Sequence, residues 1–284
     1  MQQAVNAERC ISRSMAPAPR INQPPSDIVT RGHLIHAPPA GAQPAHLSAH
    51  EVSTAFSVWA GSWVLAHYLG LQGDTLLQPR SILELGAGTG LAGLAAAAAL
   101  RRPTTLTDLS EVLPQLRANV ERNATALDDV AVRVAALDWI EARRCGSLPS
   151  DLRGPWDLVL AADCVWSAFL IEPFAEALSL ACGPSTLALL AYTSRSGLCD
   201  RALADALASR GFSLTPLPVP ERDSWVATAL LYECRKVPDD AERPAPFDFE
   251  AHLIEVGVLA PDYPGKGCGL RIYDLSLPFF RSVR

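Results

Sequence analysis

The sequence lacks the patterns that would indicate disulfide bonds, a membrane span or a general attraction to nucleic acid. Its seven cysteines form no C-x-x-C pair, and an odd number fits no closed disulfide framework. We therefore expect reduced thiols in an intracellular compartment. The longest apolar stretch, Leu91 to Leu100, is about half of a membrane span, so we expect no membrane partner. With 24 basic against 30 acidic residues, the net charge of −6 creates no field that would steer the chain onto nucleic acid.

Two kinds of catalytic site are also missing from the sequence. The six histidines show no zinc-ligand spacing beside cysteines, so we expect no metal. No G-x-S-x-G elbow occurs, and nucleophilic catalysis is therefore unsupported. A protein or a small molecule is the partner class that remains.

The most informative segment that is present runs from Ile82 to Leu91 and reads Ile-Leu-Glu-Leu-Gly-Ala-Gly-Thr-Gly-Leu. Three glycines at every second position indicate a turn that a ligand approaches closely, because glycine has no Cβ. Counted from Gly86, the third glycine falls one residue earlier than in the dinucleotide spacing G-x-G-x-x-G. Glu84 would repel a pyrophosphate but suits a cationic amino-acid moiety. The segment predicts a nucleotide-type cofactor with a cationic end.

Short β-type runs alternate with helical stretches from residue 81 onward, which predicts βαβ units around a parallel sheet and an α/β fold. We expect strands over 81–85, 104–107, 130–134, 157–161 and 186–192, and helices over 91–100, 111–123, 170–181 and 199–209. Two candidates compete for the closing hairpin. One pairs 212–219 with 226–233, and the other uses 251–259 with 270–277, which would leave one extra strand near the C-terminus.

The N-terminal region differs in composition from the rest of the chain. Residues 1–45 are rich in Pro, Ala, Ser and Arg, which predicts a flexible, disordered leader. Its arginines are also similar to those of an organelle transit peptide. A cytoplasmic protein with an untargeted tail and an organelle-targeted one both stay open. We expect residues 46–284 to form one catalytic domain, with an N-terminal cap over 46–75 that is helical from about Ala49 to Leu71.

Further candidate residues follow the predicted strands, because ligands of an open parallel sheet bind beyond the carboxyl ends of its strands. Asp108 ends the second strand, where a carboxylate can accept hydrogen bonds from two ribose hydroxyls. Asp138 and Trp139 follow the third strand and offer an acceptor for an exocyclic amine and an indole face for a purine. Asp163 ends the fourth strand, next to where the reactive end of the cofactor should lie. A lone Trp is more often a core residue, so each of these residues alone is a weak indication of a cofactor site.

Five segments together resemble methyltransferase family 16, a lysine methyltransferase group with a seven-strand Rossmann-like fold that uses S-adenosylmethionine. They are Val58-Trp59-Ala60-Gly61, Leu83 to Leu91, Leu106-Thr107-Asp108, Leu137-Asp138-Trp139 and Ala162-Asp163-Cys164-Val165-Trp166, and the resemblance covers roughly residues 56–194. It implies a doubly wound sheet of order 3-2-1-4-5-7-6 with the last strand antiparallel. It also implies cofactor contacts from Trp59, Gly86, Ala87, Gly88, Asp108, Trp139 and Ala162, with Glu84 facing the methionine end.

One departure from the family pattern concerns the acceptor side. The usual Asp-x-x-Tyr is Asp163-Cys164-Val165-Trp166 here, so the tyrosine hydroxyl is lost and Trp166 becomes the candidate substrate contact. We expect Asp163 to position an ammonium rather than to deprotonate it, because a nearby carboxylate favours the charged form. The resemblance implies N-methylation of a protein lysine, and we expect a monomer. A small amine or a protein histidine as acceptor, and a non-catalytic cofactor-binding module, stay open.

Overall fold

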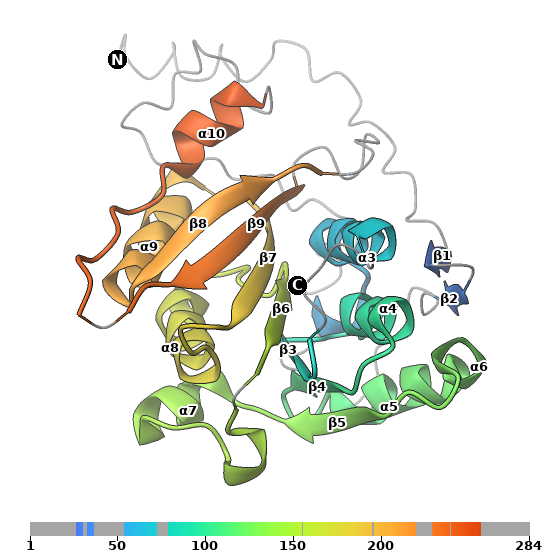
Figure 1. Cartoon of the computed structure of the whole chain (residues 1–284). Coiled ribbons are helices and arrows are strands. Elements are labelled where there is room, and N and C mark those ends of the chain that lie inside the picture. Colours follow the sequence, from blue (N-terminus) through green and yellow to red (C-terminus); the bar gives the residue numbers. More distant parts are fainter. Residues whose placement is uncertain are drawn as a thin grey trace, which may run out of the picture.

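A seven-stranded sheet lies at the centre of the molecule and carries helices on both faces (Figure 1). The computed structural model describes residues 27–30, 33–36, 54–72, 79–154, 156–194, 196–219, 229–238 and 240–256. The strands of the sheet are β3 (Ile82–Leu85), β4 (Thr104–Asp108), β5 (Val132–Ala136), β6 (Leu158–Ala162), β7 (Leu187–Thr193), β8 (Phe212–Leu217) and β9 (Ala229–Lys236).

The strand order is β5-β4-β3-β6-β7-β9-β8. Strand β9 runs antiparallel to both of its neighbours, and the other pairings are parallel. Counted from β3 as the first strand, the order is 3-2-1-4-5-7-6. The predicted fold class, the order and the antiparallel last strand are confirmed.

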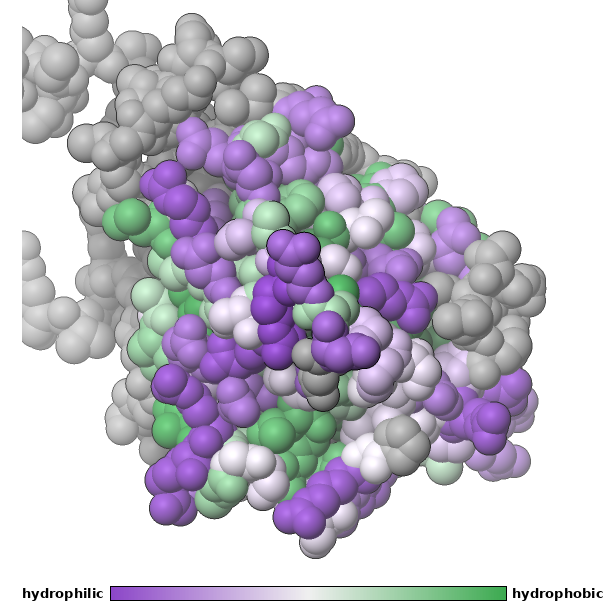
Figure 2. Space-filling model, turned by 60° about the vertical axis from the view of Figure 1, so that its left-hand side comes forward, coloured by the Kyte–Doolittle hydropathy of each residue, from purple (hydrophilic) through white to green (hydrophobic). Residues whose placement is uncertain are grey.

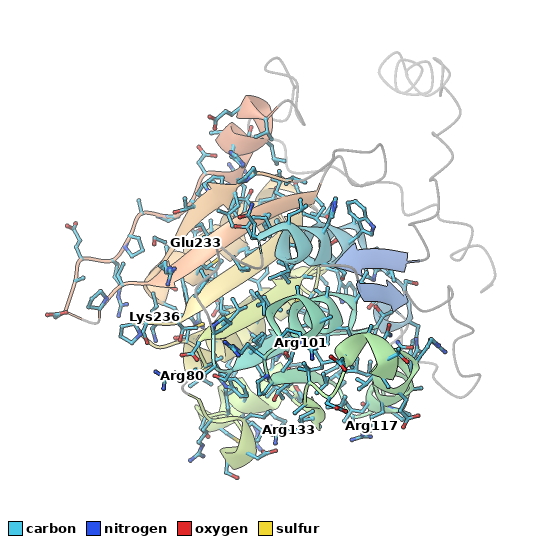
Figure 3. All side chains as sticks on the ribbon, turned by 45° about the vertical axis from the view of Figure 1, so that its right-hand side comes forward. Arg80, Arg101, Arg117, Arg133, Glu233 and Lys236 are labelled. Carbon is cyan, nitrogen blue, oxygen red and sulfur yellow. The ribbon has the colours of Figure 1, made fainter. Side chains whose placement is uncertain are left out.

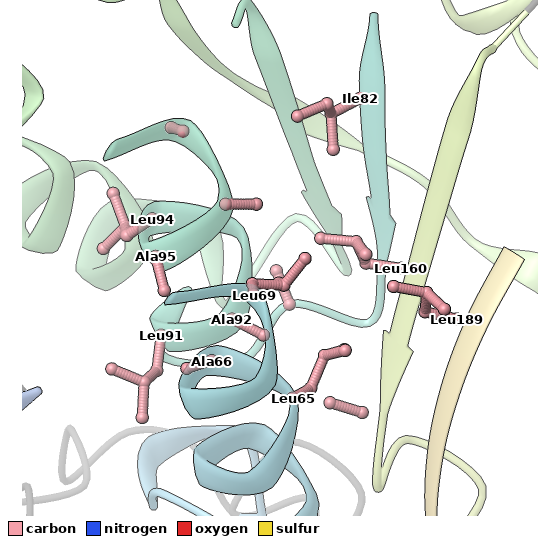
Figure 4. Packing of buried hydrophobic residues seen from close by; sticks show 14 of the residues in the cluster. Leu65, Ala66, Leu69, Ile82, Leu91, Ala92, Leu94, Ala95, Leu160 and Leu189 are labelled. Carbon is pink, nitrogen blue, oxygen red and sulfur yellow. The ribbon is translucent and has the colours of Figure 1, made fainter. Parts of the chain in front are cut away.

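Alternating side chains of the central strands divide the core into two halves. Ile82 of β3 packs with Leu160 and Leu189 beneath helices α3 (Ala60–Gln72) and α4 (Leu91–Leu100) (Figure 4). Leu83 and Leu85 belong to the opposite half, which α7 (Trp139–Cys145), α8 (Ile171–Ala181) and α9 (Gly197–Ser209) cover. All residues of β3 and β6 are buried, as expected of parallel strands covered on both faces.

Helix α4 is apolar all round because other elements surround it. Every one of its residues is buried, and α3 and the short helix α6 (Ala124–Leu127) flank it on the same face of the sheet. Its Leu, Ala and Gly composition lets it pack closely against α3 and the sheet (Figure 4). Helix α5 (Leu113–Arg122), at the end of the sheet near β5, is amphipathic and buries Leu113 and Leu116.

The closing hairpin is β8 with β9, so the first of the two expected pairings is correct. The alternative is wrong for residues 251–255, because they belong to helix α10 (Phe249–Glu255). The carboxylate of Asp248 accepts a hydrogen bond from the nitrogen of Ala251 at 2.9 Å, and Phe249 and Leu253, four residues apart, are buried together. Residues 270–277 lie outside the described residues. No strand follows β9 in the described part, so the extra strand is not found there.

Two short strands lie within the region expected to be a disordered leader. Strands β1 (Asp27–Thr30) and β2 (His33–His36) form an antiparallel hairpin that lies against α3 and α4 (Figure 1). The expectation of a leader without secondary structure is therefore wrong for this hairpin. The cap is observed as a 3-10 turn η1 (Thr54–Phe56) followed by α3.

The molecular surface on the side of α8 and α9 is a mixture of hydrophilic and hydrophobic areas (Figure 2). Within the described ranges, no helix has both the length and the apolar character needed to cross a membrane.

Candidate functional site

A cavity of about 190 Å³ opens at the carboxyl ends of β3, β4 and β6. Its floor is the turn after β3, and its walls are the residues that follow β4, β5 and β6. Thr54, Ala55, Ser57, Trp59 and Ser62 of the N-terminal cap complete the lining. The position agrees with the rule that ligands of open α/β sheets bind beyond the strand carboxyl ends.

The glycine turn has the backbone conformation that its sequence predicts. Gly86 and Gly88 have φ values of 65° and 52°, in the left-handed region that favours glycine. A Cβ at Gly86 would lie 2.8 Å from the Cβ of Cys164 and 3.0 Å from the ring of Trp139, so a larger residue does not fit. Gly86, Ala87 and Gly88 all line the cavity.

Asp108 lies at the end of β4 and is hydrogen-bonded to the turn. Its Oδ2 accepts a hydrogen bond from the nitrogen of Gly88 at 2.7 Å, and its Oδ1 accepts one from Leu109 at 2.8 Å. Burial raises the pKa of this carboxyl above its ordinary value. Each carboxylate oxygen can accept more than one hydrogen bond, so Asp108 retains capacity for hydroxyl groups of a ligand in the cavity.

Glu84 occupies a different position from the expected one. It is buried and does not line the cavity; its Oε2 accepts a hydrogen bond from the nitrogen of Gly93 in α4 at 3.0 Å. Burial raises the pKa of Glu84 to about 8; the Gly93 hydrogen bond opposes this shift and Asp108 adds to it. Glu84 therefore supports the glycine turn from the α4 side of the sheet.

Asp138 and Trp139 have structural contacts and also line the cavity. Oδ1 of Asp138 caps α7 by accepting hydrogen bonds from Ile140 at 2.8 Å and Glu141 at 3.3 Å. Its Oδ2 accepts none from the residues that the structure describes. The Trp139 ring packs edge-to-face on Phe174, with centroids 5.5 Å apart, and lies over Gly86.

Asp163 joins three parts of the chain at the cavity wall. Its Oδ2 accepts hydrogen bonds from the nitrogen of Gly61 at 2.6 Å and from Oγ1 of Thr193 at 3.1 Å, and its Oδ1 accepts one from the nitrogen of Thr193 at 2.8 Å. It is buried, with a φ of 50°, which is uncommon for a residue with a side chain. Ala162 precedes it and also lines the cavity.

The two tryptophans expected at the site lie on different walls. Trp59 donates a hydrogen bond from Nε1 to the oxygen of Thr54 at 2.8 Å, which holds η1 against α3. Trp166 lies beside Phe169, with ring centroids 5.9 Å apart and planes at 88°. Both tryptophans line the cavity.

Further residues lie at the cavity or support its glycine turn, and the two exposed ones at its rim were not predicted. Ile140 and Phe169 are exposed apolar residues at its rim, and neither follows a strand directly. Asn119 donates a hydrogen bond from Nδ2 to the oxygen of Thr89 at 2.9 Å and so fixes the end of the glycine turn.

The lining is acidic. Asp108, Asp138 and Asp163 contribute carboxylates, and in the part of the chain that the structure describes no Lys, Arg or His lines the cavity. Arg80 and Arg101, labelled in Figure 3, precede β3 and β4 and so lie near the amino ends of these strands, opposite the carboxyl ends where the cavity opens. S-adenosylmethionine has a sulfonium, an ammonium, a ribose diol and an adenine, and the lining offers acceptors and an indole ring for these groups. A pyrophosphate would meet only repulsion from these carboxylates.

The sheet order, the glycine turn after its first strand and the acidic residue after its second define the seven-strand class of S-adenosylmethionine-dependent methyltransferases. The family model described as lysine methyltransferase matches residues 45–203, and the chain belongs to this family.

Two curated relatives illustrate the similarity. The chain is 33% identical to protein-lysine N-methyltransferase rrg1 of Schizosaccharomyces pombe over 119 residues, which are 41% of this chain and 39% of that protein. It is 33% identical to protein N-lysine methyltransferase METTL21A of Danio rerio over 148 residues, 52% of this chain and 65% of the relative. The matched part thus spans less than two thirds of either relative. Among solved structures, the mitomycin 7-O-methyltransferase MmcR aligns with a TM-score of 0.45 and 17% identity over 63% of this chain and 53% of that chain.

Proposed function

We propose that this chain transfers a methyl group from S-adenosylmethionine to the side-chain nitrogen of a lysine on a protein. The observation that carries the proposal is the acidic cavity at the carboxyl ends of the strands, whose lining among the described residues has three carboxylates and no basic side chain. Such a lining favours two cationic ligands, a sulfonium and a lysine ammonium. Membership of the lysine methyltransferase family supports the same acceptor.

The cofactor-binding residues of this proposal divide by chemistry. S-adenosylmethionine supplies a methyl group that is already activated by its positive sulfur. Asp108 accepts hydrogen bonds from the ribose hydroxyls, and Oδ2 of Asp138 accepts one from the exocyclic amine. Trp139 packs against the purine. The remaining contacts are made by Gly86, Ala87, Gly88, Trp59 and Ala162, while Glu84 supports the turn.

The acceptor lysine must lose a proton before it can react. From an ordinary pKa near 10.4, this loss costs roughly 4 to 5 kcal/mol at pH 7. A sulfonium close by and the exclusion of water both lower the pKa of an amine. Asp163 acts in the opposite direction, because its carboxylate stabilises the ammonium. We therefore assign Asp163 to binding and orienting the lysine, with the proton passing to solvent.

Trp166 is the reason for considering a second class of acceptor. A tyrosine hydroxyl that could contact a lysine is missing at this position, so a protein histidine or a small amine is the alternative acceptor. A non-catalytic cofactor-binding module is the alternative from outside the enzymes. These candidates differ in where a transferred methyl group would appear.

The test uses S-adenosylmethionine with a deuterated methyl group, the full chain and a cell lysate. After the reaction, proteins are separated from small molecules, hydrolysed in acid and analysed by mass spectrometry. We expect the label in methyllysine, and no label above background with Asp108→Ala, which removes the ribose contact. Label in methylhistidine, or only in small molecules, would replace the lysine assignment. Binding of the cofactor without transfer in repeated lysates would favour the non-catalytic module.

A further inference from the structure

Two buried carboxylates hold three consecutive residues where β7 ends. Asp163 accepts hydrogen bonds from the nitrogen of Thr193 at 2.8 Å and from its Oγ1 at 3.1 Å. Asp200, which is 3% exposed in the first turn of α9, accepts one from the hydroxyl of Tyr192 at 2.7 Å and one from Oγ of Ser194 at 2.6 Å. The residues on either side of Thr193 are therefore bound to a second carboxylate.

The two carboxylates lie on opposite sides of β7, because side chains alternate along a strand. Ala191 packs in the half of the core beneath α3 and α4, whereas Tyr192 belongs to the half that α7, α8 and α9 cover. Thr193 is next in this alternation and contacts Asp163, which also bonds to the start of α3. Asp200 thus lies on the α9 side of the strand and Asp163 on the α3 side.

The described hydrogen bonds connect Asp200 to the cavity through Thr193 and Asp163. Asp163 lines the cavity, whereas Asp200 and Ser194 do not. Loss of a hydroxyl bonded to Asp200 would allow Thr193 to move, and the carboxylate on its other side would move with it. Methyl transfer depends strongly on such positions, since a misplacement of about 1 Å can lower a rate roughly a hundredfold.

We propose that Asp200 is a positioning residue for methyl transfer, because its bonds to Tyr192 and Ser194 fix Thr193 and thereby the carboxylate that orients the acceptor lysine. The inference rests on the proposed function, in which Asp163 orients that lysine. The proposed function itself assigns no role to the buried carboxylate on the α9 side of β7.

Removal of the Ser194 hydroxyl tests this role in the labelled-lysate reaction, with the concentration of S-adenosylmethionine varied. We expect Ser194→Ala to lower the maximal rate of methyllysine formation about tenfold and to leave the KM for the cofactor within about twofold. Ser194→Thr restores the hydroxyl and should restore most of the rate. Ser209→Ala is the matched control, because it removes a hydroxyl that bonds to the oxygen of Ala206 near the other end of α9. An unchanged rate in Ser194→Ala, even with a lower melting temperature, would overturn the inference.

A double-mutant cycle shows whether this network acts through Asp163. If it does, adding Ser194→Ala to Asp163→Asn should lower the rate by less than about twofold further. A second loss as large as in the unsubstituted chain would overturn the inference. If Ser194→Ala does not fold, Tyr192→Phe, which removes the other hydroxyl and keeps the ring against Phe249, gives the same comparison.

Amide hydrogen exchange, followed by NMR, gives a readout without methyl transfer. The N–H groups of Gly61 and Thr193 donate to Asp163, so Ser194→Ala should speed their exchange about fivefold. The N–H of Gly93, which bonds to a different buried carboxylate, should exchange as before. Unchanged exchange at both Gly61 and Thr193 would overturn the inference. Absence of any methyllysine with the unsubstituted chain would instead overturn the proposed function, whatever the exchange result.

Discussion

The carboxylate of Asp163 accepts a hydrogen bond of 2.6 Å from the backbone nitrogen of Gly61, which lies 102 residues earlier in the chain. Gly61 is in the first turn of α3, so Asp163 satisfies one of the free N–H groups at that helix start. The bond connects the N-terminal cap to the end of β6 and thus to the cavity wall. A residue predicted from its position after a strand therefore also holds the cap in place.

Asp163→Asn should lower both methyl transfer and stability. An amide places an NH₂ group against one of the N–H donors of Gly61 or Thr193, and a buried mismatch of this kind costs about 1–3 kcal/mol. We expect a lower melting temperature, at least a tenfold loss of methyl transfer and little change in cofactor affinity. Thr193→Val removes one hydroxyl contact and leaves the carboxylate, so it should retain more activity. A large loss of cofactor affinity in Asp163→Asn would assign Asp163 to the cofactor.

Gly61→Ala should separate the cap from the sheet. A Cβ at this position would lie 2.7 Å from Cγ of Asp163, so one of the two elements must move. Overpacking of this kind costs about 1–3 kcal/mol, which thermal or urea unfolding can measure. Gly197→Ala is the matched control, because a Cβ there meets no atom within 4 Å. Equal stability of the two variants would show that the contact between α3 and Asp163 is dispensable.

Asp108→Asn should weaken cofactor binding more than it weakens folding. The amide retains one oxygen for the backbone but loses the charge and the second acceptor for ribose hydroxyls. We expect affinity for S-adenosylmethionine to fall at least about tenfold, equivalent to about 1.4 kcal/mol. Asp205→Asn, at an exposed residue outside the cavity lining, is the control and should bind normally. Unchanged affinity in Asp108→Asn would remove Asp108 from the site.

Glu84 should make stability depend on pH. Its pKa is about 8 in the folded chain and near 4.5 when exposed, so between these values the folded state holds a proton that the unfolded state has lost. The contribution of Glu84 to stability is therefore full below about pH 4.5 and decreases as the pH rises toward 8. Glu84→Gln should reduce this decrease, as measured by urea unfolding at pH 5, 6, 7 and 8. If the free energy of unfolding changes with pH in the same way for both proteins, the pKa of Glu84 is not raised.

Local patterns in the sequence predicted most of the fold. The helix over Leu91–Leu100 has the predicted ends, and β4, β6 and β7 begin or end within one residue of the expectation. Residues 251–255 could not be assigned in the same way. Their helix depends on the cap from Asp248 and on packing of α10 against α9, which are not visible as periodicity in so short a segment.

The candidate site was predictable where residues directly follow strands. Asp108, Asp138, Trp139, Ala162 and Asp163 all line one cavity, although their individual roles stay predictions. The contribution of Thr54, Ala55 and Ser57 depends on how the cap folds over the turn, and no local pattern indicates it. The position of the Glu84 side chain also depends on tertiary structure, because the strand places it on the α4 side of the sheet.

The glycine spacing was less specific than it first appeared. Counted from Gly88, the residues Gly88, Gly90 and Gly93 do match G-x-G-x-x-G. The third of these, however, lies inside α4, where a Cβ would overlap Leu106 and the carboxylate of Glu84. Gly93 therefore serves helix packing, and the acidic lining of the cavity distinguishes the cofactor better than the spacing does.

Calorimetric titration of the full chain decides whether this acidic cavity binds S-adenosylmethionine. We predict one binding site for S-adenosylmethionine per chain, weakened at least about tenfold in Asp108→Asn, and no heat of binding with NAD. Binding of NAD alone, or binding of S-adenosylmethionine that Asp108→Asn leaves unchanged, would show that this cavity is not an S-adenosylmethionine site.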